Sequence, residues 1–379
     1  MAKMENKSDT GARRIIIAAG GTGGHFYPGF ALAKHLKDKG WEVLFLVKEN
    51  DMSLPRLREA GFPYVEVSLS SFPRTLNPFR QFKFFREFLK AVSFINSCVK
   101  DYMPNAVLGT GSYIGTTAVF SAWLKGVPAF IHESNSIPGL GNRIAMGMCK
   151  KVFLGIPFRN GPLSKKIVLT GTPVRETFAN LPSKEFARNE LNLKKDKFTI
   201  LVFGGSQGAD RLNMAVLSSF MVLKDKIQLI HITGRADYQR MLDNYKNHKL
   251  MDSPGFILSA YREDMPILYA AADLIISRSG ASTFAELLQT EKPAILVPFP
   301  QAAGNHQFHN ARELERAGTA VCVEETELFF KELEIVLESI VSGKKSVREM
   351  SAKYKEIKIP RGIESAAITA EEIEKAIAN

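Results

Sequence analysis

Short apolar runs that alternate with helical patterns are the feature that most restricts the fold of this chain. Six such runs lie between residues 13 and 173, and five more follow between residues 199 and 300. Strand-like runs separated by helical patterns are typical of parallel α/β architecture. The sequence therefore predicts an α/β protein in which the same arrangement occurs twice.

The length of 379 residues also favours two domains. The charged, turn-rich stretch over residues 173–196 is the predicted linker between them. The predicted segments are a disordered lead-in at 1–12, an N-terminal Rossmann-like domain at 13–175, a C-terminal Rossmann-like domain at 176–360 and a helical tail at 361–379. Helices are expected at 29–39, 79–98, 210–222, 282–290 and 305–317.

The composition is that of a soluble globular protein, with 45% hydrophobic and 23% charged residues. No apolar run approaches the roughly 18 residues that span a bilayer, so no transmembrane segment is expected. The polar N-terminus lacks the pattern of a secretory signal. Three scattered cysteines match neither a disulfide framework nor a zinc site, and they indicate a reducing cytoplasm.

Positive charge is concentrated in the first half of the chain. Residues 1–175 contain 24 lysines and arginines against 11 acidic residues, whereas residues 176–379 contain 26 against 28. This asymmetry indicates a polyanionic partner for the first half, which would be nucleic acid, an anionic membrane or a phosphorylated substrate.

Glycine-rich loops follow three of the predicted strands. They are GGTGG at residues 20–24, GTGSYIG at 109–115 and GGSQGA at 204–209. Main-chain N–H groups at a strand end, with the dipole of the next helix, bind phosphate well. A tight structural turn would explain any one of these loops. Three loops in two α/β units predict several anionic groups held at the carboxyl ends of the strands.

Polar residues near these strand ends are the candidate side chains. His25 directly follows the first loop and has either a structural role or that of a general base. His132 and Glu133 end another apolar run and are expected to face the same cleft. In the second half, Glu286 is suited to accept two ribose hydroxyls, or it serves only as favourable charge near a helix start. NHQFHNA, with Gln307, suits polyhydroxyl binding or is a solvated helix start.

Eight motifs together carry a family resemblance over almost the whole chain. They are GGTGGHFYPG, GTGSYIG, HESNSIPGLGNR, GTPVR, GGSQGA, YREDM, SRSGASTFAE and NHQFHNA, in that order. In this order they resemble the MurG family, bacterial UDP-N-acetylglucosamine transferases that convert lipid I into lipid II in peptidoglycan synthesis. The resemblance implies a GT-B fold of two Rossmann-like domains with parallel sheets facing across a cleft. It also implies an inverting transfer at the cytoplasmic face of the cell membrane.

The resemblance further implies individual roles. The N-terminal domain would bind the polyprenyl-diphosphate-linked acceptor and an anionic membrane surface, and the C-terminal domain would bind UDP-GlcNAc. His25 would be the catalytic base. The implied substrate contacts are Thr22, Gly23, Gly24, Asn135, Arg175, Ser206, Arg262, Ala281, Ser282, Thr283, Phe284, Ala285, Glu286 and Gln307. The chain departs from the family at Ser134, where glutamine is usual, and at Arg262, where a hydrophobic residue usually presents its backbone to uracil.

The diphosphate leaving group is expected to need no divalent ion. The chain contains no Asp-x-Asp motif, which holds the metal in many glycosyltransferases. Fixed dipoles of the 204–209 loop and the following helix, together with Arg175, would stabilise the developing charge instead. We therefore predict no metal and no cofactor.

Residues 74–90 form a segment that is rich in both basic and aromatic residues. On a helix, Phe82, Phe84, Phe85, Phe88, Leu89 and Val92 fall on one arc, and Arg80, Lys83, Arg86 and Lys90 fall on the opposite one. Such a helix either lies on an anionic membrane surface or buries its phenylalanines in the domain core. A mixture of the two, with Leu76 and Phe79 exposed, is also open.

Other functions fit the sequence less well. A nicotinamide oxidoreductase would need a fingerprint glycine where the chain has Phe26 and a ribose-binding acid about 20 residues on. A nucleic-acid-binding protein would explain the positive charge, but the sequence contains no recognisable nucleic-acid-binding motif, so we predict no nucleic-acid partner. Within the GT-B class, a diacylglycerol glycosyltransferase and a non-hydrolysing UDP-GlcNAc epimerase remain the alternatives.

Overall fold

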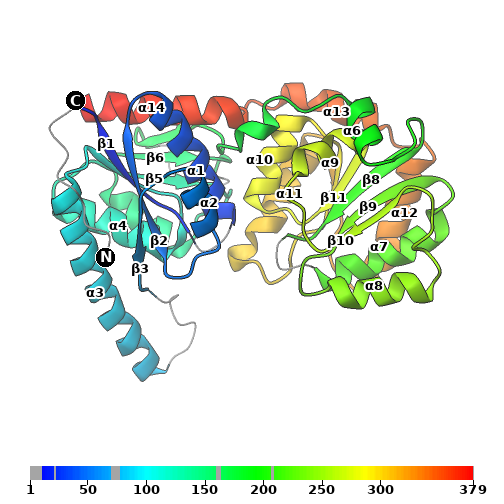
Figure 1. The fold of residues 1–379 in the computed structure, drawn as a ribbon, viewed down its shortest axis with the longest axis horizontal. Coiled ribbons are helices and arrows are strands. Elements are labelled where there is room, and N and C mark those ends of the chain that lie inside the picture. The colour runs from blue at the N-terminus through cyan, green and yellow to red at the C-terminus, as the bar shows by residue number, and fades with distance from the viewer. Residues whose placement is uncertain (1–10, 21–22, 70–76, 159–163, 206–208, 379) are drawn as a thin grey trace. The chain divides into compact units, whose positions relative to one another are not determined.

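The computed structural model describes residues 11–20, 23–69, 77–158, 164–205 and 209–378. The chain forms two compact units. One consists of Met1–Arg175 together with Gly362–Asn379, and the other of Glu176–Arg361. Each unit is an α/β fold built around one parallel sheet (Figure 1).

The first unit has a seven-stranded parallel sheet in the order β3-β2-β1-β4-β5-β6-β7. Its strands are β1 (Arg14–Ala18), β2 (Glu42–Lys48), β3 (Tyr64–Val67), β4 (Ala106–Gly109), β5 (Ala129–Glu133), β6 (Lys151–Leu154) and β7 (Ile167–Leu169). Its helices are α1 (Gly23–Asp38), α2 (Leu54–Glu59), α3 (Pro78–Tyr102), α4 (Ser112–Leu124), α5 (Leu140–Ala145) and α14 (Gly362–Ala378), with a 3-10 turn η1 (Met146–Met148).

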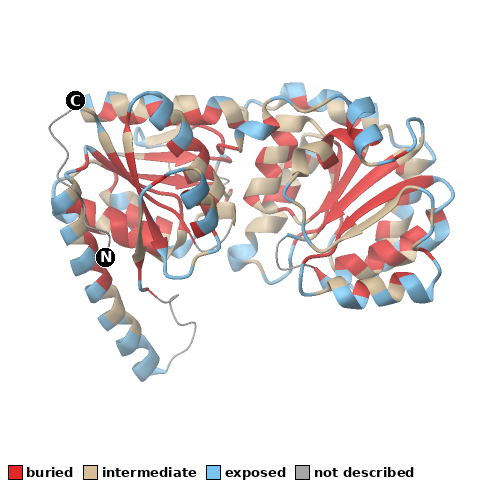
Figure 2. Cartoon of the chain, in the orientation of Figure 1, coloured by how far each residue is buried: buried red, intermediate tan, exposed pale blue. Residues whose placement is uncertain are grey.

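Both faces of this sheet are covered, which explains why its strands read as uninterrupted apolar runs. Ile15 and Ile17 point into a core shared with α1, α2 and α14. Ile16 and Ala18, the alternate residues of β1, point into a second core shared with α3 and α4. Figure 2 shows the buried strands at the centre of the unit.

Helix α14 belongs to the first unit although it comes last in the chain. Trp41 donates its indole N–H to Glu374 across 3.3 Å, and the Lys150 ammonium donates to the carbonyl of Ala376 across 2.9 Å. Ile373 is fully buried in the core that faces α1. The helical tail predicted at 361–379 is observed as a helix over Gly362–Ala378.

The second unit has a six-stranded parallel sheet in the order β10-β9-β8-β11-β12-β13. Its strands are β8 (Phe198–Phe203), β9 (Ile227–Ile232), β10 (Phe256–Ser259), β11 (Leu274–Ser277), β12 (Ala294–Leu296) and β13 (Ala320–Cys322). Its helices are α6 (Lys184–Glu190), α7 (Asp210–Leu223), α8 (Tyr238–Asn247), α9 (Met265–Ala271), α10 (Ala281–Thr290), α11 (His306–Arg316), α12 (Phe329–Val341) and α13 (Val347–Ala352), with 3-10 turns η2 (Glu176–Phe178), η3 (Ala303–Asn305) and η4 (Lys353–Glu356).

The stretch 173–196, expected as a linker, contains the boundary between the two units at Arg175 and Glu176, and from Glu176 on it belongs to the second unit and includes η2 and α6. Arg188 in α6 is 1% exposed, and its guanidinium pairs with Asp273 at 2.6 Å and donates to the carbonyl of Ala271 at 3.0 Å. A buried, fully engaged arginine ties α6 to the end of α9. One charge of this stretch is therefore buried in an ion pair, whereas most of its other charged residues are exposed.

The strand order places the glycine loops at one point of each sheet. In the first unit, β1 and β4 are neighbours from which the later strands run outward in opposite directions. β8 and β11 hold the same position in the second unit. Ligands of open parallel sheets bind at the carboxyl ends of such strand pairs. The three glycine-rich loops begin after β1, β4 and β8 in the chain, and the SRSGASTFAE motif begins at the end of β11, so the described parts of these segments lie at the carboxyl ends of the two strand pairs.

Candidate functional site

The β1–α1 turn places His25 in the first turn of α1, which begins at Gly23. Gly23 and Gly24 open the helix, whereas Thr22 lies outside the described residues. Gly29 lets the helix approach the sheet closely, because a Cβ at this position would lie 3.0 Å from Ile17 and 3.2 Å from Thr110. The glycines therefore bring the start of α1 against the ends of β1 and β4.

The β4–α4 turn contacts His25 directly. The Nδ1 atom of the His25 ring lies 3.1 Å from the carbonyl oxygen of Thr110, and the Thr110 hydroxyl donates to the carbonyl of His25 across 2.6 Å. Two loops that are 85 residues apart in the chain are thus joined by a reciprocal pair of hydrogen bonds. Thr110 is a site residue that the sequence analysis missed, although it lies within the GTG motif.

His132 and Glu133 are placed differently from the prediction. Both side chains are buried, at 1% and 3% exposure, so they hold the end of β5 and do not face a cleft. His132 donates from Nε2 to the carbonyl of Gly171 at 2.9 Å, and its Nδ1 lies 3.2 Å from the Ser134 hydroxyl. Burial lowers the pKa of His132, which keeps the ring neutral.

The Glu133 carboxylate organises the loop that carries Asn135. It accepts hydrogen bonds from the main-chain N–H of Asn135 at 2.9 Å, from the Asn135 amide at 3.1 Å and from the Asn142 amide at 2.8 Å. It also accepts from the Gly139 N–H at 3.2 Å. Asn135 is therefore held in a fixed orientation after β5 by a buried carboxylate.

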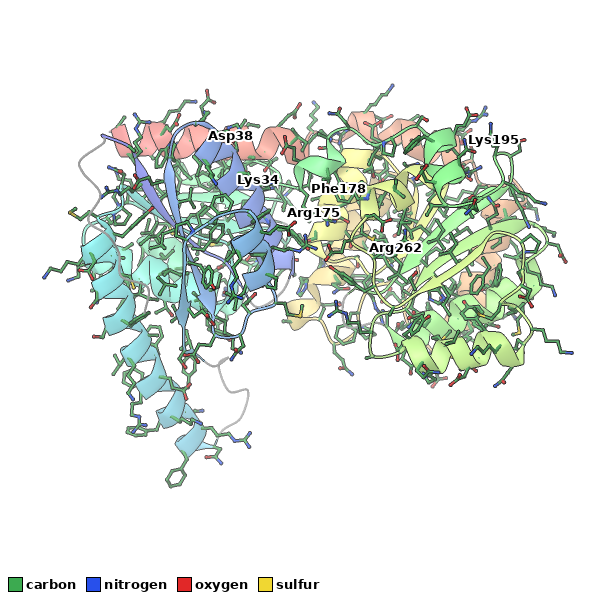
Figure 3. The ribbon with its side chains drawn as sticks, in the orientation of Figure 1. Lys34, Asp38, Arg175, Phe178, Lys195 and Arg262 are labelled. Carbon is green, nitrogen blue, oxygen red and sulfur yellow. The ribbon has the colours of Figure 1, made fainter. Side chains whose placement is uncertain are left out.

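Arg175, the last residue of GTPVR, lies over the ring of Tyr27, with 4.8 Å between the guanidinium carbon and the ring centroid (Figure 3). Arg56 of α2 lies over the same ring at 5.5 Å. Tyr27 follows His25 by two residues, and its ring lies 3.3 Å from where a Cβ on Gly23 would stand. Two cations are thus held beside the N-terminus of α1.

In the second unit, SRSGASTFAE forms the β11–α10 turn and the first turns of α10. Ala281, Phe284 and Ala285 are buried, at 8%, 3% and 3% exposure, so their side chains pack within the unit. Thr283 lies among these residues in the same turns. Glu286 accepts a hydrogen bond from the hydroxyl of Tyr269 at 3.0 Å.

The start of α10 also contains a buried hydroxyl. The Ser282 Oγ has no hydrogen-bond partner among the residues that the structure describes.

Ser206 of the β8–α7 loop lies outside the described residues, and the preceding Gly205 has a left-handed φ of 95°.

Gln307, at the start of α11, is brought close to the β11–α10 turn. The Ser279 hydroxyl donates to the carbonyl of Gln307 at 2.7 Å, and the Asn310 amide donates to the carbonyl of Ser279 at 3.2 Å. The Gln307 side-chain oxygen accepts from the main-chain N–H of Phe299 at 3.0 Å. The two motifs of the second unit therefore converge at the carboxyl ends of β11 and β12.

Arg262 lies in the β10–α9 connection, at the same edge of the second sheet (Figure 3). Its guanidinium forms a bidentate ion pair with the carboxylate of Asp264, with 2.7 Å between Nε and Oδ1. The hydrogen bond from Arg262 lowers the pKa of Asp264. The neighbouring Tyr261 ring lies 4.8 Å from the guanidinium of Arg235.

Comparison with known proteins gives matches over both units. Residues 15–154 match the glycosyltransferase family 28 N-terminal domain, and residues 199–365 match the family 28 C-terminal domain. The chain is 36% identical over 369 residues to an Elusimicrobium minutum protein named UDP-N-acetylglucosamine--N-acetylmuramyl-(pentapeptide) pyrophosphoryl-undecaprenol N-acetylglucosamine transferase, covering 96% of this chain and 99% of the relative. A Bacillus subtilis protein of the same name is 32% identical, covering 96% of this chain and 100% of that relative. The chain belongs to the MurG family.

Solved structures agree with this assignment. The crystal structure of Acinetobacter baumannii MurG superposes with a TM-score of 0.77 at 26% identity, covering 96% of this chain and 99% of that one. A Rickettsia africae glycosyltransferase, at 15% identity and a TM-score of 0.65 over 97% of this chain and 99% of its own, shares the fold. The predicted class of two parallel-sheet Rossmann-like domains of the GT-B type is confirmed.

The serine at position 134, a departure from the MurG family, has a structural explanation. Its hydroxyl supports the buried ring of His132 rather than lining an open site. The other departure, Arg262, is held by its own neighbour Asp264.

Helix α3 divides the aromatic residues of the basic segment between two environments. Phe84 and Phe88 pack inward, with Phe84 edge-on to Tyr113 at 5.9 Å and Phe88 against Phe120 at 6.0 Å. Four apolar side chains in the first half of α3 remain outside, namely Phe79, Phe82, Phe85 and Leu89, which are 84%, 68%, 56% and 50% exposed, and Phe94 further along the helix is 45% exposed. Arg80, Lys83, Arg86 and Lys90 are exposed as well.

We call the four exposed residues Phe79, Phe82, Phe85 and Leu89 the α3 apolar face. The mixed arrangement is the one that the structure supports, while Leu76 lies outside the described residues. In the described part of the chain, no helix is long and apolar enough to cross a membrane. Nor do the described residues contain a group of three His, Cys, Asp or Glu side chains suited to a metal ion.

Arg278 is a further residue that the sequence analysis missed. It is nearly buried, forms an ion pair with Glu325 at 2.7 Å and donates to the carbonyls of Val297 and Pro298 at 3.2 Å. Burial lowers its pKa, and Glu325 opposes that shift. This arginine holds the end of β12 beside the β11–α10 turn, a role that depends on contacts distant in sequence.

Proposed function

We propose that this protein transfers N-acetylglucosamine from UDP-GlcNAc to lipid I, its polyprenyl-diphosphate-linked acceptor, and so forms lipid II in peptidoglycan synthesis. The observation that carries the proposal is the similarity over 96% of the chain to relatives named for this transfer. The same comparison favours this activity over diacylglycerol glycosylation and over UDP-GlcNAc epimerisation.

The activity is tested by incubating the protein with labelled UDP-GlcNAc and separate acceptors. We expect label to appear on the polyprenyl-diphosphate sugar and not on diacylglycerol. Conversion of UDP-GlcNAc to its 2-epimer without acceptor would establish the epimerase instead. Label on diacylglycerol alone would equally overturn the proposal.

His25 is the proposed general base. In a single displacement, the acceptor hydroxyl loses its proton to His25 while its oxygen bonds to the anomeric carbon. The bond from that carbon to the diphosphate breaks, and UDP leaves with the electron pair, so the configuration inverts. His25 at the carboxyl end of β1, held by the β4–α4 turn, supports this role. His25→Ala should lower kcat by about 10² to 10⁴, and turnover close to normal would refute the role.

The leaving diphosphate is stabilised by fixed dipoles in this proposal. The main-chain amides of residues 204–209, the N-terminus of the 14-residue helix α7 and the guanidinium of Arg175 supply them. Thr22, Gly23 and Gly24 supply further N–H or hydroxyl donors at the start of α1. We expect turnover to persist in excess chelator, and loss of activity that Mg²⁺ restores would overturn the metal-free mechanism.

Recognition of the donor falls to the second unit. Glu286 accepts the ribose hydroxyls, Gln307 binds the sugar, and the main chain at 262 contacts uracil. Asn135 and Ser206 complete the contacts. Glu286→Gln should raise KM for UDP-GlcNAc about tenfold or more, because a charged acceptor is lost. Glu338→Gln, on an exposed part of α12, is the matched control and should leave KM unchanged.

The first unit binds the cytoplasmic face of the cell membrane peripherally in this proposal. The α3 apolar face lies among the exposed cations Arg80, Lys83, Arg86 and Lys90. Apolar side chains enter the headgroup region while lysine and arginine contact anionic lipids. Such binding would keep the enzyme beside an acceptor that is anchored in the leaflet.

A further inference from the structure

The contact between His25 and the β4–α4 turn determines which ring nitrogen holds a proton. A carbonyl oxygen only accepts hydrogen bonds, so the 3.1 Å bond from His25 to the Thr110 carbonyl requires a proton on Nδ1. In the neutral ring the lone pair then resides on Nε2. The nitrogen that can take up a proton from a substrate is therefore Nε2.

The Thr110 carbonyl is itself rigidly held. Thr110 is 2% exposed, and its main-chain N–H donates to the carbonyl of Ala18, the last residue of β1, at 3.1 Å. Its hydroxyl donates to the carbonyl of His25 at 2.6 Å. The acceptor for Nδ1 is thus fixed both to the sheet and to the backbone of the histidine that it orients.

Gly111 leaves the space that the imidazole ring needs. A Cβ at position 111 would stand 2.6 Å from Cε1 and 3.1 Å from Cγ of His25, and it would be closer still to Nδ1. The φ of Gly111 is 107°, a conformation that L side chains rarely adopt. Two independent constraints therefore exclude a side chain at this position.

We propose that Thr110 and Gly111 are positioning residues for the proposed base. Together they select the Nδ1–H tautomer of His25, fix the ring plane and present Nε2 for proton transfer. The inference rests on the role proposed for His25, and it adds the atom that acts and the residues that orient it. Neither residue needs to touch the substrate.

The tautomer is tested without reference to activity. Nitrogen-15 labelled histidine gives two-bond correlation patterns that distinguish an Nδ1–H ring from an Nε2–H ring. The spectrum is recorded at about pH 8.5, where an ordinary imidazole is neutral, and the His25 signals are those that disappear in His25→Gln. We expect the Nδ1–H pattern, and an Nε2–H pattern would overturn the inference.

Kinetics test the positioning role. Thr110→Val removes the hydroxyl and keeps the shape, and we expect kcat to fall about tenfold or more while KM for UDP-GlcNAc changes less than about twofold. Thr110→Ser should restore most of kcat. Gly111→Ala should lower kcat at least as far. Gly147→Ala, at an exposed glycine with nothing within 4 Å of the added Cβ, is the control and should behave as wild type.

The outcomes separate this inference from the proposed function. Normal turnover by His25→Ala would refute the catalytic role of the histidine, whatever the tautomer. An inactive His25→Ala combined with full kcat in Thr110→Val and Gly111→Ala would refute the positioning role alone. Because misfolding also lowers kcat, the melting temperatures of the variants are compared. If Thr110→Ser has no higher kcat than Thr110→Val at an equal melting temperature, the positioning role is refuted.

Discussion

Removing two side chains of the α3 apolar face should release the protein from membranes by a predictable factor. Phe82 and Phe85 are 68% and 56% exposed, so they contribute little to the core. Burying a whole phenylalanine side chain stabilises by about 1.5–3 kcal/mol, and roughly two-thirds of each ring is available to the bilayer. The pair therefore contributes about 2–4 kcal/mol, which corresponds to roughly 30- to 700-fold in the binding constant.

The assay is sedimentation with vesicles that contain anionic lipid, at several salt concentrations. Phe82→Ala with Phe85→Ala should lower binding at every salt concentration. Neutralising Arg80, Lys83, Arg86 and Lys90 to glutamine should lower it mainly at low salt, because each cation contributes about 1 kcal/mol that salt screens. The two variants thus separate apolar insertion from electrostatic attraction.

A matched control comes from the second unit. Phe330 and Ile335 on α12 are 39% and 55% exposed, and their replacement by alanine removes a similar apolar area. Vesicle binding by this control should equal that of the wild type. Equal losses in the two pairs, or unchanged binding after loss of Phe82 and Phe85, would refute the assignment of α3 as the membrane contact.

Three further predictions concern stability. Burial lowers the pKa of His231 to about 3 from an ordinary 6.5. Because the folded state disfavours protonation, stability is complete well above pH 6.5 and falls as the pH drops toward 3. Urea denaturation should therefore show a loss of about 1.6 kcal/mol in the free energy of unfolding between pH 6.5 and 5, and His231→Gln should lack it. Ser112 has a left-handed φ of 65°, and its hydroxyl has no hydrogen-bond partner among the described residues, so Ser112→Gly should raise the free energy of unfolding by about 1 kcal/mol and with it Tm. Arg188→Met leaves the Asp273 carboxylate without its buried partner and should cost about 3 kcal/mol in chemical denaturation, whereas Lys184→Met, at a half-exposed partner of the same carboxylate, should cost under about 1 kcal/mol.

The strands were the most predictable part of the fold, because burial on both faces leaves a strong signal in the sequence. Ile15, Ile16 and Ile17 are all fully buried, which requires three consecutive apolar residues. The start of α1 was less predictable. Its first turns contain Gly23, Gly24 and Pro28, residues of low helix propensity, and they are helical because the helix docks on β1 and β4.

Sequence periodicity predicts a face of a helix but not its partner. On α3 it grouped Phe84 and Phe88 with Phe82 and Phe85, and only contacts with Tyr113 and Phe120 of α4 separate them. His132 and Glu133 show the same limit, because their position at a strand end was predictable and their inward orientation was not. The role of Thr110 depends on a hydrogen bond that spans 85 residues.

The return of α14 to the first unit imposes an order on biosynthesis. Ala370 and Ile373 complete the core against α1, yet they are translated only after the whole second unit. Until α14 has been translated, the apolar surface of the first unit that α14 covers therefore stays exposed, although every strand of both sheets has already been made. Premature termination near residue 361 would leave that flank open permanently, and such products would be natural targets for chaperones and proteases.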